Sequence, residues 1–216
     1  MAYIRVGLFG VSRSGKNYTI DDFLALSKEA GLEFIHLSPM DMIRERLGTR
    51  RLRDMGLEEK IALVKEVREE IDVICESHNV IVDEHYCYPS TFGGKRLDNG
   101  YFDEKLPHDI LKVDGHDTEY EVVFPRFEYD KYDLILCMDI DPSIIVDRCR
   151  TSEGAKRNND ITVEQARRWE QVELEGAFRE GHMMNGYSRI NDPKNSGKQV
   201  YNALCAYRAR CALSNT

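Results

Sequence analysis

A glycine-flanked segment near the N-terminus has the residue types and spacing of a phosphate-binding loop. It reads Gly10-Val11-Ser12-Arg13-Ser14-Gly15-Lys16, which matches the pattern G-x-x-x-x-G-K. Glycines let the backbone wrap so that successive N–H groups face an anion, and the N-terminus of a following helix adds partial positive charge. The pattern therefore predicts that ATP binds here and that Lys16 reaches its β- and γ-phosphates. The other contacts would come from Gly10, Ser12, Arg13, Ser14 and Gly15.

The elements expected on either side of this loop decide between phosphate binding and an ordinary turn with a solvated lysine. Residues 3–9 form a strand-like apolar segment, and residues 16–30 repeat apolar side chains at helical spacing up to Gly31. A strand before the loop and a helix after it favour phosphate binding. Tyr18 or Tyr86 is a candidate to stack on the base, although aromatic side chains near a sheet edge usually pack in the core.

A magnesium site is expected near the loop, although one usual ligand is missing. The Ser or Thr that normally follows the lysine is replaced by Asn17, whose amide oxygen is a substitute ligand. Asp83 and Glu84 close an apolar strand, where the carboxyl ends of parallel strands converge on ligands. Such acids are often only solvated, but the loop favours Asp83 as a Mg²⁺ ligand or acceptor-side group. His85 beside them is more often a structural than a catalytic residue.

The order of apolar runs and amphipathic stretches is typical of a parallel sheet flanked by helices, which predicts an α/β fold. Strands are expected at residues 3–9, 34–37, 79–83, 134–138 and 187–190. Helices are expected at residues 16–30, 39–48, 57–76, 142–150, 163–179 and from 199 onward. Asp141-Pro142 has the pattern of an N-cap followed by proline, and Thr162 to Gln165 has the capping-box spacing.

Residues 88–132 interrupt this alternation and are interpreted as an insertion. Gly93-Gly94, Asn99-Gly100 and Asp114-Gly115 are turn signals, and residues 119–124 alternate like a hairpin strand. The insertion is a surface excursion, a substrate cover or a subunit contact. The last alternative leaves a homodimer open.

Phosphoryl transfer needs cations around the transferring group, and the chain has arginines outside the loop. One cluster follows the strand at 34–37, and a second follows the strand at 134–138. Each cluster alone would usually be a solvated helix face. Two clusters at the same edge of the sheet as the phosphate-binding loop indicate a kinase. Their members are Arg44, Arg46, Arg50, Arg51, Arg53, Arg148, Arg150, Lys156, Arg157, Arg167 and Arg168.

Three segments resemble adenylate kinases, and the compact archaeal-type enzymes are the most similar. Residues 38–44, Ser-Pro-Met-Asp-Met-Ile-Arg, resemble the family's Gly-Asp-Met-Leu-Arg, and residues 141–148 resemble its helix leading to the lid. Residues 157–160, Arg-Asn-Asn-Asp, with Arg168 farther along, are similar to the lid's Arg-x-Asp-Asp and its following arginine. Residues 82–85 lie where the family has Ile-Asp-Thr-His, and Asn191-Asp192 looks like its adenine-side loop.

This resemblance implies a fold, a domain plan and residue roles. The expected fold is a three-layer P-loop kinase-type sheet of about five parallel strands, forming one domain over residues 1–216. Within it, residues 38–78 would bind the acceptor, 88–132 form the insertion and 149–161 form a short lid. Arg44 would hold an acceptor phosphate, and Asn191 would lie beside the adenine. The transferring group would be surrounded by Lys16, Arg148, Arg157 and Arg168.

Composition limits the partners. The 216 residues include 30 Lys and Arg against 38 Asp and Glu, and this net charge of −8 argues against nucleic acid or an acidic membrane as partner. No N-terminal signal segment or bilayer-spanning stretch is evident, so we expect a cytoplasmic protein. The six cysteines form no Cys-x-x-Cys pair and are expected to be buried thiols rather than disulfides or zinc ligands.

Together these features predict transfer of the γ-phosphoryl group of Mg-ATP to a nucleoside or deoxynucleoside monophosphate. An acceptor phosphate is already ionised at neutral pH and needs no strong base. One alternative is a kinase for a nucleoside or another hydroxyl-bearing metabolite, in which Asp83 would act as the base. The other is a non-catalytic ATP-binding regulatory protein, which Asn17 favours.

Overall fold

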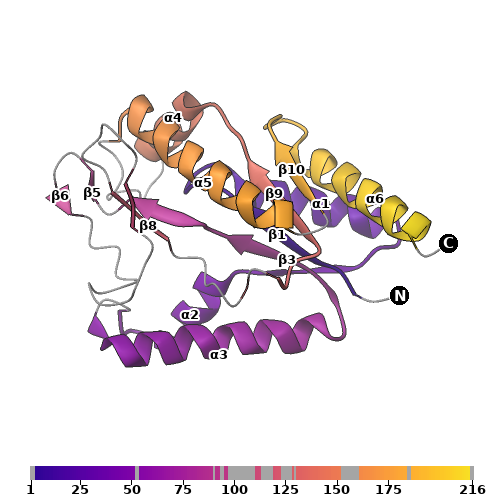
Figure 1. The fold of residues 1–216 in the computed structure, drawn as a ribbon, viewed down its shortest axis with the longest axis horizontal. Coiled ribbons are helices and arrows are strands. Elements are labelled where there is room, and N and C mark those ends of the chain that lie inside the picture. The colour runs from indigo at the N-terminus through magenta and orange to yellow at the C-terminus, as the bar shows by residue number, and fades with distance from the viewer. Residues whose placement is uncertain are drawn as a thin grey trace.

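Five parallel strands form the central sheet, and the N-terminal strand lies in its middle (Figure 1). The strands are β1 (Arg5–Phe9), β2 (Phe34–Leu37), β3 (Asn79–Glu84), β9 (Leu134–Met138) and β10 (Tyr187–Ile190), in the order β10-β9-β1-β3-β2. Both ends of each strand lie within two residues of the ends predicted from the sequence. The α/β class and the parallel sheet of five strands are therefore confirmed.

The computed structural model describes most of the chain outside the insertion and the lid. The described residues are 3–51, 54–89, 91–92, 95–96, 110–112, 119–122, 128, 130–151, 161–183 and 186–214. Most of the predicted lid, including Arg157, lies outside these residues.

Helices cover both faces of the sheet, which gives the predicted three layers (Figure 1). On one face, α1 (Lys16–Glu29) and α6 (Ser196–Ser214) pack against the sheet. The other face packs against α2 (Pro39–Leu47), α3 (Leu57–Cys75), α4 (Pro142–Thr151) and α5 (Val163–Met183). The first turn of α6 begins at Ser196, before the expected Gln199, and α5 continues past Arg179.

Alternating side chains of the central strands enter two separate cores. In β1, Val6 and Leu8 pack toward α1 and α6, whereas Phe9 packs toward α3 and α5. In β3, Ile81 faces the first core, and Val80 and Val82 face the second. Strands buried on both faces are the reason why these segments read as continuous apolar runs.

The N-termini of α4 and α5 have the capping hydrogen bonds that the sequence predicts. The Asp141 carboxylate accepts a hydrogen bond from the Ser143 N–H at 2.8 Å, directly before the first turn of α4. The Thr162 hydroxyl accepts from the Gln165 N–H at 3.2 Å, and the Gln165 side chain accepts from the Thr162 N–H at 2.9 Å. This reciprocal pair is the capping box that starts α5.

The insertion contributes short antiparallel strands to the described structure. β4 (Cys87–Pro89), β8 (Glu119–Val122) and β7 (Ile110–Lys112) form a sheet in the order β4-β8-β7, and β5 (Thr91–Phe92) pairs with β6 (Lys95–Arg96). The predicted hairpin strand is present as β8, although Phe124 lies outside the described residues. Tyr120 of β8 is buried, so this small sheet packs on the body rather than standing free.

The cysteines are only partly as expected. Cys87, Cys137 and Cys149 are buried thiols, and Cys75 and Cys211 are half-buried. The prediction is wrong for Cys205, which is exposed, because it occupies a solvent-facing position of α6.

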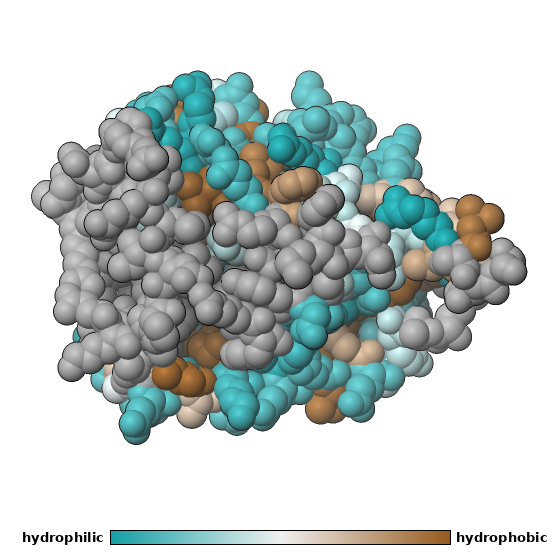
Figure 2. Space-filling model, viewed as in Figure 1, coloured by the Kyte–Doolittle hydropathy of each residue, from teal (hydrophilic) through white to brown (hydrophobic). Residues whose placement is uncertain are grey.

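The surface that Figure 2 shows is mostly hydrophilic, with hydrophobic residues in small separate patches outside the grey region. The exposed large apolar side chains of the described residues include Tyr3, Val73, Phe178 and Leu213, which belong to different elements. Apolar side chains scattered in this way are normal on a protein surface. A homodimer therefore stays a prediction. Across the described part of the chain, none of the helices combines the length and the apolar character needed to cross a bilayer.

We expect Gly176→Ala to destabilise the fold. A Cβ at this position of α5 would overlap the buried ring of Tyr86, so either the ring or the helix must move. Overpacking of this kind costs about 1–3 kcal/mol, which urea denaturation would measure. In a Tyr86→Ala background the same substitution should cost much less, because the clash is gone. An equal cost in both backgrounds would contradict this packing.

Candidate active site

The pairing of β1 with β3 brings two loops together at the carboxyl edge of the sheet. Their parallel register places Phe9 opposite Glu84. Gly10, which begins the phosphate-binding loop, and His85 therefore leave the sheet as neighbours. This edge is where open α/β sheets bind ligands.

The phosphate-binding loop takes the tight path that its glycines predict. Gly15 has a φ of 103°, and a Cβ at Gly10 would lie 2.8 Å from the Met138 Cβ. Arg13 has a φ of 69°, which is uncommon for a residue with a side chain. Backbone strain of this kind clusters at ligand-binding sites.

Arg148 of α4 holds the outer side of the loop. Its guanidinium donates hydrogen bonds to the carbonyls of Arg13 at 3.1 Å and Ser14 at 2.8 Å. In a trans peptide the N–H points opposite to the carbonyl, so the Gly15 N–H is directed away from Arg148. The predicted Arg148 is therefore at the loop, where it ties back carbonyl groups that would repel an anion.

Lys16 occupies the centre of the site and is only 6% exposed. Its ammonium donates to the Gly10 carbonyl, lies 3.1 Å from the His85 Nε2 and is 3.5 Å from the Asp83 Oδ1. The structure thus brings together two predicted site residues, Lys16 and Asp83, and adds His85. The Lys16 charge faces the end of β3 as well as the loop.

His85 is held as a neutral imidazole. Burial, together with the charge of Lys16, lowers the pKa of His85 well below its usual value. A neutral ring whose Nε2 accepts from Lys16 carries its proton on Nδ1. His85 therefore orients the lysine without competing for its charge.

The environment of Asp83 fits a metal ion or a hydroxyl group. Its Oδ1 is buried and has no hydrogen-bond partner among the described residues, although Lys16 lies nearby. Asn17 is exposed on the first turn of α1, so its amide oxygen is accessible. Hard oxygen ligands suit Mg²⁺, which usually keeps several waters and few protein ligands. The donor types of Asp83 and Asn17 therefore suit a magnesium ion, and their joint binding of one stays a prediction.

A pocket opens beside Lys16 between the end of β3 and the helices α2 and α3. Asp83 and His85 line one side, and apolar side chains line much of the rest. Its remaining described residues are Pro39, Met40, Ile43, Val64, Val67, Arg68, Glu84 and Tyr88. Part of this pocket lies within residues 38–78, whose role in binding the acceptor stays a prediction.

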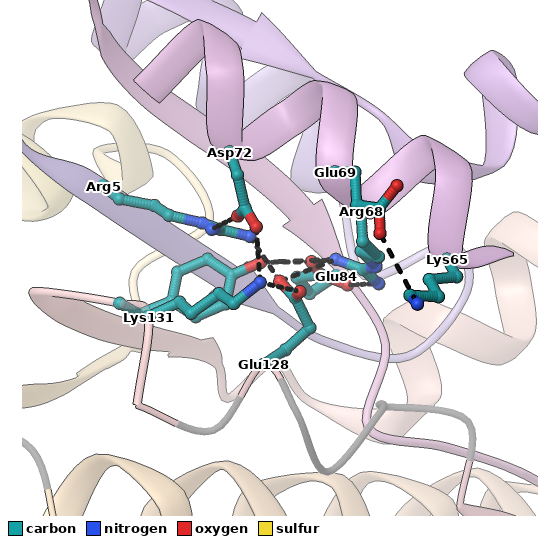
Figure 3. Close-up of polar contacts among 9 residues, drawn as sticks. Arg5, Lys65, Arg68, Glu69, Asp72, Glu84, Glu128 and Lys131 are labelled. Atoms are coloured by element: carbon teal, nitrogen blue, oxygen red, sulfur yellow. Dashed lines mark hydrogen bonds and ion pairs between the residues drawn. The ribbon is translucent and has the colours of Figure 1, made fainter. Parts of the chain in front are cut away.

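An ionic network includes two residues that line this pocket, Arg68 and Glu84 (Figure 3). The Arg68 guanidinium donates two hydrogen bonds to the Glu84 carboxylate, one of them at 3.0 Å to Oε2, and the Tyr132 hydroxyl donates to the same carboxylate. All three side chains are buried. Burial, reinforced by the Glu84 charge, raises the pKa of Tyr132 well above its usual value, so its hydroxyl stays a donor.

The network continues along the sheet through two further cations and two further carboxylates. Arg5 pairs with Asp72 at 2.7 Å and with Glu128, and its guanidinium lies 4.5 Å from the centre of the Tyr132 ring. Lys131 pairs with Asp72 and with Glu128, the latter at 3.0 Å (Figure 3). With Arg68 and Glu84, the network holds three cations and three carboxylates, so its charges balance.

Other predicted residues lie farther from Lys16. Arg44 on α2 is 69% exposed and pairs with Asp41 at 2.6 Å, so it does not line the pocket. Arg168 on α5 pairs with Glu164 at 3.0 Å, and its buried Nη1 has no hydrogen-bond partner among the described residues.

The two candidates for the adenine side are both exposed. Tyr18 is 61% exposed beside the loop, and the Asn191 side chain accepts from Gln199 at 2.9 Å. The roles of Tyr18 and Asn191 stay predictions.

Comparison with known proteins supports the fold but not a family membership. No family model matches the sequence, and no curated protein matches it. Two solved structures are similar: the shikimate kinase from Bacteroides thetaiotaomicron and the shikimate kinase from Aquifex aeolicus. Each has a TM-score of 0.50 and 13% identity and covers 93% of this chain, with 98% and 96% of their own chains covered. At this identity the likeness shows that the chain has a P-loop kinase fold. The resemblance to adenylate kinases in particular stays a prediction.

Two carboxylates of α5 that organise this edge of the sheet were not predicted from the sequence. Glu170 accepts from the Ile140 N–H at 2.6 Å, and Glu173 accepts from the Gly10 N–H at 3.2 Å. Both are buried among Ala166, Trp169 and Ala177. The sequence did carry one indication: acidic residues stand at apolar positions of the helical repeat. A buried carboxylate at such a position rarely occurs without a polar partner.

We expect Lys16→Ala to weaken ATP binding by about 10- to 100-fold, since a hydrogen bond to a charged group contributes roughly 1.5–3 kcal/mol. Isothermal titration with a non-hydrolysable ATP analogue would measure it. Lys28→Ala, at an exposed position of the same helix, is the matched control and should bind normally. Equal binding by both variants would show that ATP does not use this loop.

We expect Glu84→Gln to destabilise the protein by about 3–5 kcal/mol, because it leaves Arg68 with an incomplete partner in a buried site. Glu69→Gln removes an exposed carboxylate 3.7 Å from Lys65 and should change stability by less than about 1 kcal/mol (Figure 3). Chemical denaturation of both variants would make the comparison. A small loss for Glu84→Gln would mean that the network contributes little.

Proposed function

We propose that this protein transfers the γ-phosphoryl group of ATP to a hydroxyl group of a small metabolite. The observation that carries the proposal is the position of Asp83. Its carboxylate lies between the Lys16 ammonium at 3.5 Å and the pocket formed with α2 and α3. A donor-binding lysine and a carboxylate facing an acceptor pocket are what a hydroxyl kinase requires.

The charges of the pocket favour a hydroxyl acceptor over a monophosphate. Arg68 is the only cationic side chain among the described residues that line the pocket, and Glu84 already neutralises it. His85 is neutral. A dianionic phosphate would enter this pocket without an unpaired cation to receive it, whereas a hydroxyl group needs only an acceptor for its proton. The fold shared with two proteins named shikimate kinases supports the same choice.

The chemistry follows from the arrangement of the chain's own groups. Loop N–H groups and Lys16 would hold the phosphates of ATP, and Asp83 would orient the acceptor hydroxyl and take its proton. The acceptor oxygen forms a bond to the γ-phosphorus while the bond to the bridging oxygen of ADP breaks. A magnesium ion beside the phosphates would neutralise phosphate charge, and Asn17 with bound waters would hold it where Asp83 serves as the base. His85 would keep Lys16 directed toward the reacting group.

A monophosphate acceptor is the second candidate, and the position of Arg44 favours it. Arg44 follows Ile43 on α2, and Ile43 lines the pocket. Its guanidinium is exposed, and its ion pair among the described residues is with the exposed Asp41. A rotation of this side chain could place it over a phosphate at the mouth of the pocket. Resemblance of residues 38–44 to the acceptor segment of adenylate kinases points the same way.

The decisive experiment measures ADP formation from Mg-ATP with nucleosides, sugars, hydroxy acids and nucleoside monophosphates as acceptors. We expect turnover with a hydroxyl acceptor and a loss of kcat of about 10²- to 10⁴-fold in Asp83→Asn, the range for a general base. Asp21→Asn, at an exposed position of α1, is the control and should keep its activity. Turnover only with monophosphates would favour the second candidate. ATP binding with no transfer to any acceptor would favour a regulatory protein.

A further inference from the structure

One buried carboxylate connects the two halves of the candidate site. Glu173 on α5 is fully buried and accepts three backbone N–H groups. They belong to Gly10 at 3.2 Å, Tyr86 at 2.7 Å and Cys87 at 3.0 Å. Gly10 begins the phosphate-binding loop, whereas Tyr86 and Cys87 follow β3 on the acceptor side. A single side chain therefore sets the spacing between the donor and acceptor segments.

The same carboxylate also faces the histidine that orients Lys16. Glu173 Oε1 lies 3.9 Å from the His85 Nδ1, a buried atom without a hydrogen-bond partner among the described residues, so its effect there is electrostatic. The His85 Nε2 lies 3.1 Å from the Lys16 ammonium. Negative charge on the Nδ1 side favours the tautomer with its proton there. That tautomer leaves the Nε2 lone pair for Lys16. Glu173 thus acts on Lys16 both through the loop and through His85.

Stability alone does not account for a carboxylate at this position. Burial raises the pKa of Glu173 to about 7, against the opposing effects of Lys16 and the three backbone donors. Ionisation of this buried group therefore costs free energy that its polar partners only partly offset. Such an arrangement is typical of groups that position a reaction rather than of groups that only fill a core.

Neighbouring side chains of α5 make similar contacts to the other loops of the site. The Trp169 indole donates to the Cys87 carbonyl at 3.0 Å, and Glu170 accepts from the Ile140 N–H at 2.6 Å in the loop between β9 and α4. One face of α5 thus contacts the backbone of three loops at the carboxyl edge of the sheet. Glu173 is the member of this face that contacts two of them.

We propose that Glu173 is a positioning residue that aligns the phosphate-binding loop and Lys16 with the acceptor segment. The inference rests on the proposed function for its kinetic consequence only. Replacement by glutamine keeps the shape but leaves one oxygen, and turns an NH₂ group toward backbone N–H donors. Because Oε1 accepts from both Gly10 and Tyr86 and Oε2 accepts from Cys87, either orientation of the amide leaves at least one backbone N–H facing an NH₂ group. His85 also loses the nearby negative charge that favours its tautomer.

The test compares Glu173→Gln with Glu175→Gln, which makes the same change at an exposed position of the same helix. It is made at pH 8.5, above the pKa of about 7 of Glu173. For Glu173→Gln we expect kcat to fall by about 10- to 100-fold while the KM for ATP changes by less than about threefold, because misalignment affects the reacting geometry more than binding. Glu175→Gln should match the wild type in both constants. Equal kcat values in the two variants would overturn the proposal.

A second readout does not depend on phosphoryl transfer. The nitrogen chemical shifts of the His85 ring report which nitrogen carries the proton, and NMR of the full chain labelled at histidine would measure them. We expect Nδ1–H in the wild type and in Glu175→Gln. In Glu173→Gln we expect a larger share of Nε2–H, which the Lys16 ammonium beside Nε2 still opposes. An unchanged tautomer would contradict the link from Glu173 to His85. A changed tautomer without turnover of any acceptor would contradict the proposed function but support the role of Glu173.

The variant Glu173→Asp covers the case in which Glu173→Gln fails to fold. It retains the charge but withdraws the carboxylate by one methylene group. We expect it to keep the wild-type His85 tautomer and an intermediate kcat, whereas a purely structural role predicts wild-type kcat in every variant that folds. Circular dichroism would establish folding first.

Discussion

The parallel pairing of β1 with β3 is the constraint on which the site depends. Its register sets Phe9 beside Glu84, so the phosphate-binding loop and the segment from Asp83 to Cys87 begin at the same edge. The two segments are more than sixty residues apart in the chain. Two polar contacts then fix the distance between these two segments. The Lys16 ammonium reaches Asp83 from the end of the loop, and the Glu173 carboxylate of α5 accepts from Gly10 and Tyr86.

Charge balance explains how so many ionised groups are tolerated near one pocket. In the network that begins at its wall, the cations Arg5, Arg68 and Lys131 are matched by Asp72, Glu84 and Glu128. Burying these groups carries a desolvation cost that only close pairing and further hydrogen bonds can offset. The network joins α3 to β1 and β3, so it also fixes the helix that forms the far wall of the pocket. Arg68, the arginine among the described residues that line the pocket, is therefore paired with Glu84.

Local signals made much of the fold predictable, and long-range polar contacts made part of the site unpredictable. Apolar runs, the glycine-flanked loop, and the caps at Asp141 and Thr162 are short-range patterns, and the structure confirms them. The meeting of Lys16 with Asp83 followed from the rule that parallel strands converge at their carboxyl ends. The partners of Glu173 and Arg68 depend on which helix covers which loop, and no local pattern specifies that. The buried positions of Arg5 and Arg68 were visible only as charges inside apolar stretches.

Under the proposed function, the contacts of Lys16 link ATP binding to the ability of Asp83 to accept a proton. In the structure its ammonium is divided among the Gly10 carbonyl, Asp83 and His85. Phosphate oxygens carry more negative charge than any of these partners and would draw the ammonium toward the loop. Asp83 would then lose part of its ion pair and become a better proton acceptor for a hydroxyl in the pocket. Because Glu173 holds the loop and the backbone of Tyr86 and Cys87 at a fixed distance, a small shift of the Lys16 ammonium is enough to exchange Asp83 for a phosphate as its partner.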